Sequence, residues 1–151
     1  MYPNVWTPHM TVAAVVEHAG RFLMVEEITD GERVFNQPAG HLEPGERLVD
    51  AVIREVREET GTRFLPEAIV GIYRWINPAT AETHVRVAFS GEIEEDEREP
   101  ELDDPIIARH WLEHDQLLAD REHLRSPLVL ACIDDYLVGS RYPLTLLREM
   151  A

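Results

Sequence analysis

Residues 40–61, Gly40-His-Leu-Glu-Pro-Gly-Glu-Arg-Leu-Val-Asp-Ala-Val-Ile-Arg-Glu-Val-Arg-Glu-Glu-Thr-Gly61, contain a loop followed by the best-defined helix of the chain. The spacing of the apolar residues predicts a helix over 47–60 that ends at Gly61, because glycine is a usual C-terminal signal. At about 100° per residue, the helix has one broad apolar face, which should pack on a sheet. This face consists of Leu48, Val49, Val52, Ile53 and Val56.

Three glutamates, Glu55, Glu58 and Glu59, fall within an arc of about 100° on this helix. Glu59 lies at the edge of the face that should be buried. Burying a carboxylate is costly unless it is paired or bound to a metal, and carboxylate oxygens are the ligands that hard divalent cations prefer. The pattern therefore predicts a Mg²⁺ site, with Mn²⁺ as the alternative ion.

A competing interpretation is that these glutamates are solvent-exposed and pair with arginines of the same helix. Arg47, Arg54 and Arg57 are available, and Arg54 stands four residues before Glu58. Periodicity alone does not decide between the two interpretations. The sequence of the loop before the helix favours the interpretation as a metal site.

The loop and the helix together resemble the Nudix box of the Nudix hydrolase superfamily. From Gly40 the sequence reads glycine, five residues, Glu46, seven residues and then 54–62, Arg-Glu-Val-Arg-Glu-Glu-Thr-Gly-Thr. One position departs from the box, because Thr62 stands where a bulky aliphatic residue is usual. The resemblance implies an α/β fold, an α/β/α sandwich around a mixed β-sheet. It also implies hydrolysis of a diphosphate linked to another moiety.

The resemblance further implies roles for individual residues. Glu55, Glu58 and Glu59 would bind the metal or position the attacking water, with the main-chain carbonyl of Ala39 as another ligand. Arg54 would support catalysis, and the loop and helix would be oriented by Gly40, Glu46 and Gly61. The chemistry is consistent, because bound cations convert an acidic site into one that accepts phosphate. An additional acidic ligand would come from Glu43 or from the glutamates between Glu92 and Glu101.

Four further stretches resemble the bacterial phosphatase NudJ branch of this superfamily: 36–43, 75–76, 125–129 and 139–144. This resemblance implies a Mg²⁺-dependent phosphatase of nucleoside di- and triphosphates and of the pyrimidine pyrophosphate precursor of thiamine, releasing phosphate. The alternatives are a pyrophosphohydrolase that releases pyrophosphate and a non-catalytic nucleotide sensor, although a sensor would be expected to lose box carboxylates. A prenyl diphosphate isomerase would need a cysteine in the pocket, whereas Cys132 falls in a late apolar helix.

Candidate substrate-binding residues lie on predicted strands. Arg33 and Arg86 could each hold a phosphate bidentately. Phe35 and Trp75 could stack on a heterocycle. Each has an ordinary alternative, a surface position for the arginines and a core position for the aromatic residues.

Composition limits the choice of partner. The chain has 151 residues, the size of one domain (1–151), and a formal net charge of -15. All 14 basic residues are arginine, so a Walker-type phosphate lysine is excluded. The negative charge disfavours binding of a nucleic acid polymer. With no apolar run of membrane length and no secretory signal pattern, we expect a cytoplasmic protein, monomer or dimer, acting on a small nucleotide or diphosphate without a membrane.

Other elements are predicted from apolar runs and turn residues. Strands are expected at 11–16 and 22–25, forming a hairpin, and at 34–35, 68–75, 83–90 and 108–111. Helices are expected at 113–119 and 128–138, and a charged loop at 92–105. Because strands and helices interleave without regular βαβ alternation, a mixed sheet covered by helices is favoured.

Overall fold

The computed structural model describes residues 4–95 and 106–150. Its strands are β1 (His9–Val15), β2 (Glu17–His18), β3 (Arg21–Thr29), β4 (Glu32–Asn36), β5 (Ala39–His41), β6 (Thr62–Ile76), β7 (Thr83–Glu95) and β8 (Ile106–Glu113). The helices are α1 (Leu48–Thr60), α2 (His114–Ala119) and α3 (Leu128–Leu137), with short 3₁₀ turns η1 (Arg121–His123) and η2 (Leu144–Leu146).

The strands form two sheets. The first has the order β5-β1-β7-β6, in which β1 and β7 are parallel and the other neighbours are antiparallel. The second is antiparallel and has the order β2-β3-β4, with β8 on the other edge of β3. The predicted fold class, α/β with a mixed sheet, is confirmed.

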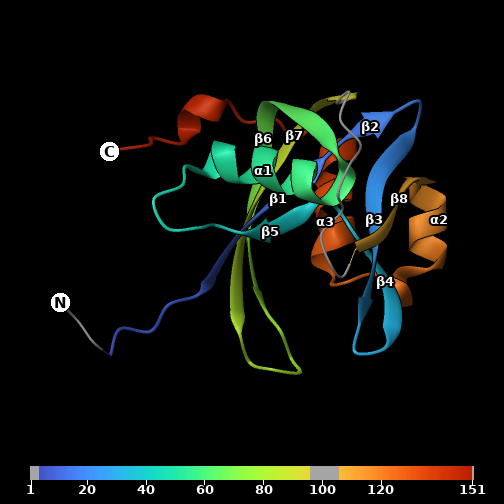
Figure 1. Cartoon of the computed structure of the whole chain (residues 1–151), viewed down its shortest axis with the longest axis horizontal. Coiled ribbons are helices and arrows are strands. Elements are labelled where there is room, and N and C mark those ends of the chain that lie inside the picture. Colours follow the sequence, from blue (N-terminus) through green and yellow to red (C-terminus); the bar gives the residue numbers. More distant parts are fainter. Residues whose placement is uncertain (1–3, 96–105, 151) are drawn as a thin grey trace.

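Helices α1 and α3 cover opposite faces of the mixed sheet (Figure 1). Residues of β1 alternate between these faces, so Val12 and Ala14 pack with α1, whereas Val15 packs with α3. The apolar face of α1 is buried as the helical wheel predicts, with Val52 and Val56 fully inaccessible to solvent. The central strands are thus buried on both sides, which explains their nearly continuous apolar sequences.

Two hairpins project from the body in the same direction, β3–β4 and β6–β7 (Figure 1). The β3–β4 turn is Asp30-Gly31, and both residues have positive φ, 52° and 79°. Asp-Gly is the preferred sequence for a two-residue hairpin turn of this handedness. This turn was not recognised from the sequence. The β6–β7 turn is longer and spans 77–82, between paired Ile76 and Thr83.

Three predictions of local structure were wrong. The runs at 11–16 and 22–25 do not pair as a hairpin, because β1 joins β5 and β7, and the separate strand β2 forms the hairpin with the start of β3. Residues 92–95 of the expected charged loop extend β7, where they pair with 62–65, while 96–105 lie outside the described residues. Ala39–His41, expected in a loop, forms the edge strand β5. Among residues 4–95 and 106–150, none of the helices combines the length and the hydrophobicity that a bilayer-spanning helix requires.

Candidate active site and substrate cleft

Helix α1 presents its glutamates beside the main chain of β5. The helix ends at Gly61, whose left-handed φ of 72° suits a glycine. Glu59 is 8% exposed, and its Oε1 accepts a hydrogen bond of 2.7 Å from the Ala39 amide. The helical wheel placed Glu59 at the edge of the buried face, and this prediction is confirmed.

Arg54 connects the loop to the helix. Its Nε donates to Glu46 Oε2 at 2.7 Å, and its Nη1 donates to Glu55 Oε1 at 2.8 Å. Nη1 also lies 3.0 Å from Glu58 Oε2, and Nη2 donates to the carbonyl oxygen of His41 at 3.0 Å. The hydrogen bond to Glu46 raises the pKa of Arg54 above its ordinary range, and the same bond lowers the pKa of Glu46. Pairing with arginine, the competing interpretation of the sequence, is therefore part of this site.

Gly40 is packed directly against Glu55. A Cβ at position 40 would lie 2.1 Å from the carboxyl carbon of Glu55, closer than any real contact. The Glu55 carboxylate therefore occupies space that only glycine leaves open. The approach fixes this carboxylate against the main chain of the loop.

These donors fit a hard divalent cation. The Glu59 carboxylate bonds to the Ala39 amide, the Glu55 carboxylate lies against Gly40, and Glu58 shares the Arg54 Nη1 with Glu55; carboxylate and carbonyl oxygens are what Mg²⁺ binds. The Arg54 guanidinium supplies positive charge to the same carboxylates within the protein itself. The site thus combines several negative charges with carboxylate oxygens that hydrogen bonds hold in place.

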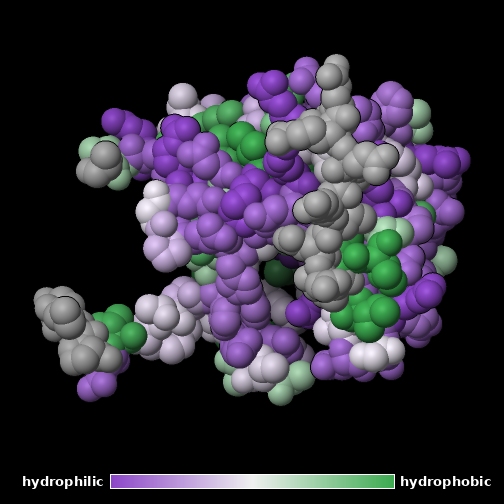
Figure 2. Space-filling view, in the orientation of Figure 1, coloured by the Kyte–Doolittle hydropathy of each residue, from purple (hydrophilic) through white to green (hydrophobic). Residues whose placement is uncertain are grey.

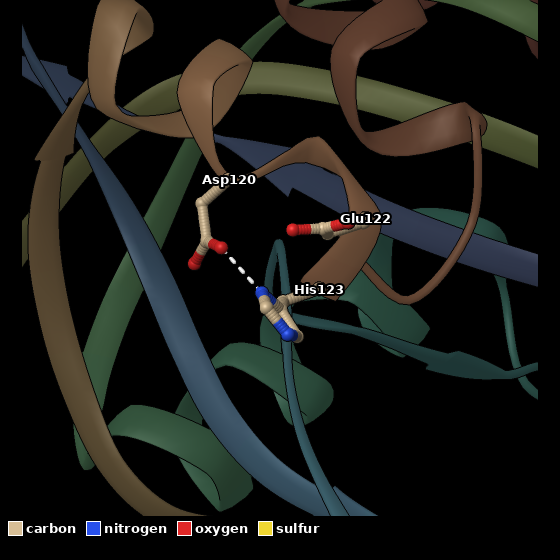
Figure 3. A group of neighbouring side chains, drawn as sticks. All are labelled: Asp120, Glu122 and His123. Atoms are coloured by element: carbon tan, nitrogen blue, oxygen red, sulfur yellow. Dashed lines mark hydrogen bonds and ion pairs between the residues drawn. The ribbon is translucent and has the colours of Figure 1, made fainter.

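A second group of possible metal ligands, Asp120, Glu122 and His123, lies at η1 (Figure 3). The His123 ring nitrogen Nδ1 hydrogen-bonds to the Asp120 carboxylate. Glu122 and His123 are exposed, and none of the three is on α1 or lines the cleft described below. This group is separate from the box carboxylates.

A cleft of about 460 Å³ opens between the two projecting hairpins. Figure 2 shows this side of the molecule as hydrophilic over α1 and hollowed between the hairpins. One wall includes Glu27 and Asn36 of the β3–β4 hairpin, and the other includes Trp75 and His84. Residues 39–41 also line it, so β5 borders both the cleft and the carboxylates of α1.

Two of the four predicted substrate-binding residues, Trp75 and Arg86, line this cleft. Arg33 and Phe35 are not among its lining residues. The Arg33 side chain is 74% exposed and lies 3.5 Å from Glu26, and the Phe35 ring packs edge-on against His110 at 5.7 Å. Both belong to β4, where the next residue, Asn36, is the one that reaches the cleft.

Arg86 is the buried cation of the cleft, with 5% exposure. Nη1 donates to Gln37 Oε1 at 2.9 Å, and Nη2 lies 3.5 Å from Asn36 Oδ1. Gln37 is itself fixed, because its amide nitrogen donates to the carbonyl oxygen of Val129 at 2.6 Å. The Nε of Arg86 is buried and has no hydrogen-bond partner.

Flat rings form a row beside Arg86 on the same sheet face. His9 and His84 stack with centroids 4.8 Å apart, and Trp75 follows His84 at 5.6 Å. His41 joins the row through its Nε2, 3.1 Å from His9 Nδ1. Desolvation and the neighbouring His9 lower the pKa of both His41 and His84. No spacing along the chain signalled this row, because its members come from four different strands, β1, β5, β6 and β7.

The candidates for an additional acidic ligand are distributed differently. Glu43 lies 3.6 Å from Arg54, within the box cluster. Glu94 and Glu95 are on β7, where they pair with Arg63 at 3.8 Å and with Arg109 at 3.3 Å. The later candidates, Glu97, Glu99 and Glu101, lie outside the described residues.

Known proteins with similar sequences have the same architecture. The NUDIX domain family matches residues 7–131. The chain belongs to the Nudix family. Phosphatase NudJ of Escherichia coli (strain K12) is 40% identical over 142 residues, which cover 94% of this chain and 92% of NudJ.

Two solved Nudix structures illustrate the range of similarity. A NUDIX hydrolase from Nitrosomonas europaea is 45% identical, with a TM-score of 0.92 and coverage of 95% of this chain and 98% of the other. The MutT protein from Methanosarcina mazei Go1 is 22% identical, with a TM-score of 0.71 and coverage of 91% and 100%. The second comparison concerns the fold alone. This Nudix protein is a hydrolase that acts on pyrophosphate bonds.

Proposed function

We propose that this Nudix hydrolase is a Mg²⁺-dependent phosphatase of nucleoside di- and triphosphates and related diphosphates. The similarity to NudJ over nearly the whole of both chains supports release of phosphate. By the same similarity, the pyrimidine pyrophosphate precursor of thiamine is a substrate to test. The observation that carries the proposal is the position of the Glu55 and Glu59 carboxylates against Ala39–Gly40, at the border of the cleft.

In this proposal, Glu55, Glu58, Glu59 and the Ala39 carbonyl hold the metal. When bound, the cation neutralises phosphate charge and lowers the pKa of the attacking water. Glu59 is kept in place by the Ala39 amide, and Glu55 is kept against Gly40. Glu46 fixes Arg54, which in turn holds Glu55 and Glu58 close together. One of these glutamates accepts the proton of the water, for which Glu58, the more exposed at 36% of its side chain against 13% for Glu55, is our choice.

The decisive assay measures phosphate released from GDP and GTP with Mg²⁺, with EDTA as a control, each with and without added inorganic pyrophosphatase. We expect direct phosphate from GDP, unchanged by pyrophosphatase. Phosphate that appears only after pyrophosphatase is added would instead indicate a pyrophosphohydrolase. No release under either condition would favour a nucleotide sensor.

Replacement of Glu58 tests its role within the site. We expect Glu58→Gln to lower kcat by about a hundredfold or more, because general-base catalysis contributes about 10²–10⁴-fold. Glu67→Gln on β6 is the matched control, since Glu67 is an exposed glutamate that does not belong to α1. Thermal unfolding of both variants should match the wild type. An active Glu58→Gln enzyme would refute the assignment of Glu58.

A further inference from the structure

Arg86 is a buried charge whose hydrogen-bonding capacity is only partly used. Within the described part of the chain its hydrogen-bond partners are neutral groups, namely two amide oxygens and a distant thiol. The contact with Asn36 is at the limit of a hydrogen bond, and Nε has no partner. A buried cation in this state is unfavourable unless an acceptor completes it. Because Arg86 lines the cleft, that acceptor can come from a ligand.

The sheet register separates Arg86 from the carboxylate site. Arg86 is paired with Thr11, and Thr11 is paired with His41, so two strand spacings lie between β7 and β5. Two spacings amount to roughly 10 Å. Arg86 also lies on the face of the mixed sheet that α3 covers, where it contacts Cys132, whereas α1 covers the other face. For a diphosphate held by the α1 carboxylates, we therefore take the group attached to the diphosphate as the part of the substrate that reaches Arg86.

The surroundings of Arg86 suit a flat polar ring. Trp75 and His84 provide ring surfaces in the adjacent row of the sheet, and Asn36 provides an amide on the opposite wall. The guanidinium is immobilised through Gln37, so it donates in a fixed direction. A donor fixed in this way selects a ligand with an acceptor atom at one position.

We propose that Arg86 is a specificity residue that donates a hydrogen bond, from the part of its guanidinium that lines the cleft, to a carbonyl oxygen or ring nitrogen of the substrate's heterocycle. The proposal deepens the function given above and rests on it. It assigns Arg86 to the heterocycle, in place of the phosphate that its sequence position first suggested. The preferred substrates are therefore diphosphates of heterocycle-bearing groups, and diphosphates of bare sugars are poor substrates.

The test compares two substrates that differ only in the base. Steady-state hydrolysis of GDP or CDP is measured beside that of ribose 5-diphosphate, for wild type and for Arg86→Gln and Arg86→Lys. We expect both variants to lose about tenfold or more in kcat/KM on the nucleotides, mainly through KM, and less than about twofold on ribose 5-diphosphate. The losses in kcat/KM caused by removing the base from the substrate and by replacing Arg86 should then be strongly non-additive.

Arg74→Gln is the matched control, because Arg74 is exposed and alternates away from the cleft face of β6. Turnover of ribose 5-diphosphate also shows that each variant is folded. Equal losses on both substrates, or no loss on either, would overturn the proposal.

The same experiments distinguish an error in the proposed function from an error in the role of Arg86. If the wild type hydrolyses neither substrate, the proposed function fails. Calorimetric titration with guanosine and cytidine then tests the cleft alone. Weaker nucleoside binding by Arg86→Gln, but not by Arg74→Gln, would still support the assignment, and unchanged binding would reject it.

Discussion

At the residue scale, Gly40 is required by its contact with Glu55 and not by an unusual backbone angle. The carboxyl group of Glu55 fills the position of the missing side chain, with all three of its outer atoms within 2.4 Å of an ideal Cβ. A methyl group there must displace Glu55, since the alternative is a shift of the loop main chain. The residue thereby couples loop geometry to the placement of one carboxylate.

We therefore expect Gly40→Ala to reduce kcat/KM by about tenfold or more, because a small displacement of a reacting group is enough to cost this much. Metal affinity should fall with it. Steady-state kinetics at saturating Mg²⁺ and calorimetric titration with Mn²⁺ are the measurements. Wild-type kinetics and affinity in this variant would show that Glu55 is not held by the loop.

Arg54 is the residue on which the charge balance of the box depends. It contacts Glu46, Glu55 and Glu58, which would otherwise repel one another. The side chain is 21% exposed, so its interactions are only partly screened by solvent. A divalent cation among the same carboxylates supplies the same sign of charge.

Arg54→Gln should lower the free energy of unfolding by about 2 kcal/mol in EDTA, since hydrogen bonds to charged groups contribute about 1.5–3 kcal/mol. Mg²⁺ should restore part of this loss, because ligand binding to the folded state stabilises it. Urea unfolding with EDTA and with Mg²⁺ measures both effects. Arg47→Gln, which removes an exposed pair with Asp50, should cost less than about 1 kcal/mol and show no greater response to Mg²⁺ than the wild type. If Mg²⁺ does not reduce the loss of unfolding free energy in Arg54→Gln, Arg54 does not stabilise the same carboxylates as the metal.

At the scale of elements, the row of rings across β1, β7 and β6 joins three strands of the mixed sheet. His9, His84 and Trp75 come from directly paired positions, so the sheet register alone brings the rings into contact. Desolvation and the nearby His9 lower the pKa of His84 below its ordinary 6.5. The folded protein therefore favours the neutral ring.

This shift has a defined effect on stability. As the pH falls below about 6.5, the unfolded chain binds a proton at His84 before the folded protein does, so stability is lost between the unfolded and the lower folded pKa. We expect His84→Phe, which keeps the stacking but removes the titration, to lose less stability than the wild type between pH 7.5 and pH 5.5. Urea unfolding at the two pH values tests this. An identical loss in both proteins would contradict it.

At the scale of the whole molecule, the acidic surface acts against the compact state. The formal net charge is -15 over 151 residues, and self-repulsion of this kind is screened by salt. The cleft carries part of this charge, because Glu27, Asp30 and Glu82 are among its lining residues. We expect screening by salt to raise the stability of the fold.

Raising NaCl from about 10 mM to about 150 mM shortens the screening length from about 30 Å to about 8 Å. In EDTA, we expect this change to raise the urea midpoint of unfolding. The same change near the isoelectric point is the control, and its effect there should be small. A midpoint that falls with salt at neutral pH would mean that attractive ion pairs outweigh the net repulsion.

The sequence alone determined the features that depend on neighbours along the chain. The helix predicted over 47–60 and found at Leu48–Thr60, its end at Gly61 and the burial of Glu59 follow from helical periodicity, which fixes relative directions locally. Strong apolar runs likewise located most strands, although their ends were set too short.

Only the tertiary structure decided which distant segments meet. The β5 edge, the parallel pairing of β1 with β7 and the extension of β7 through Glu95 depend on partner strands far away in sequence. The same holds for the choice of Arg86 over Arg33 at the cleft, since a strand's alternation gives two faces but does not say which one is covered. The helical periodicity of the sequence predicted where the carboxylates lie on the helix. The cleft beside them forms only when the two sheets pack together and their hairpins project side by side.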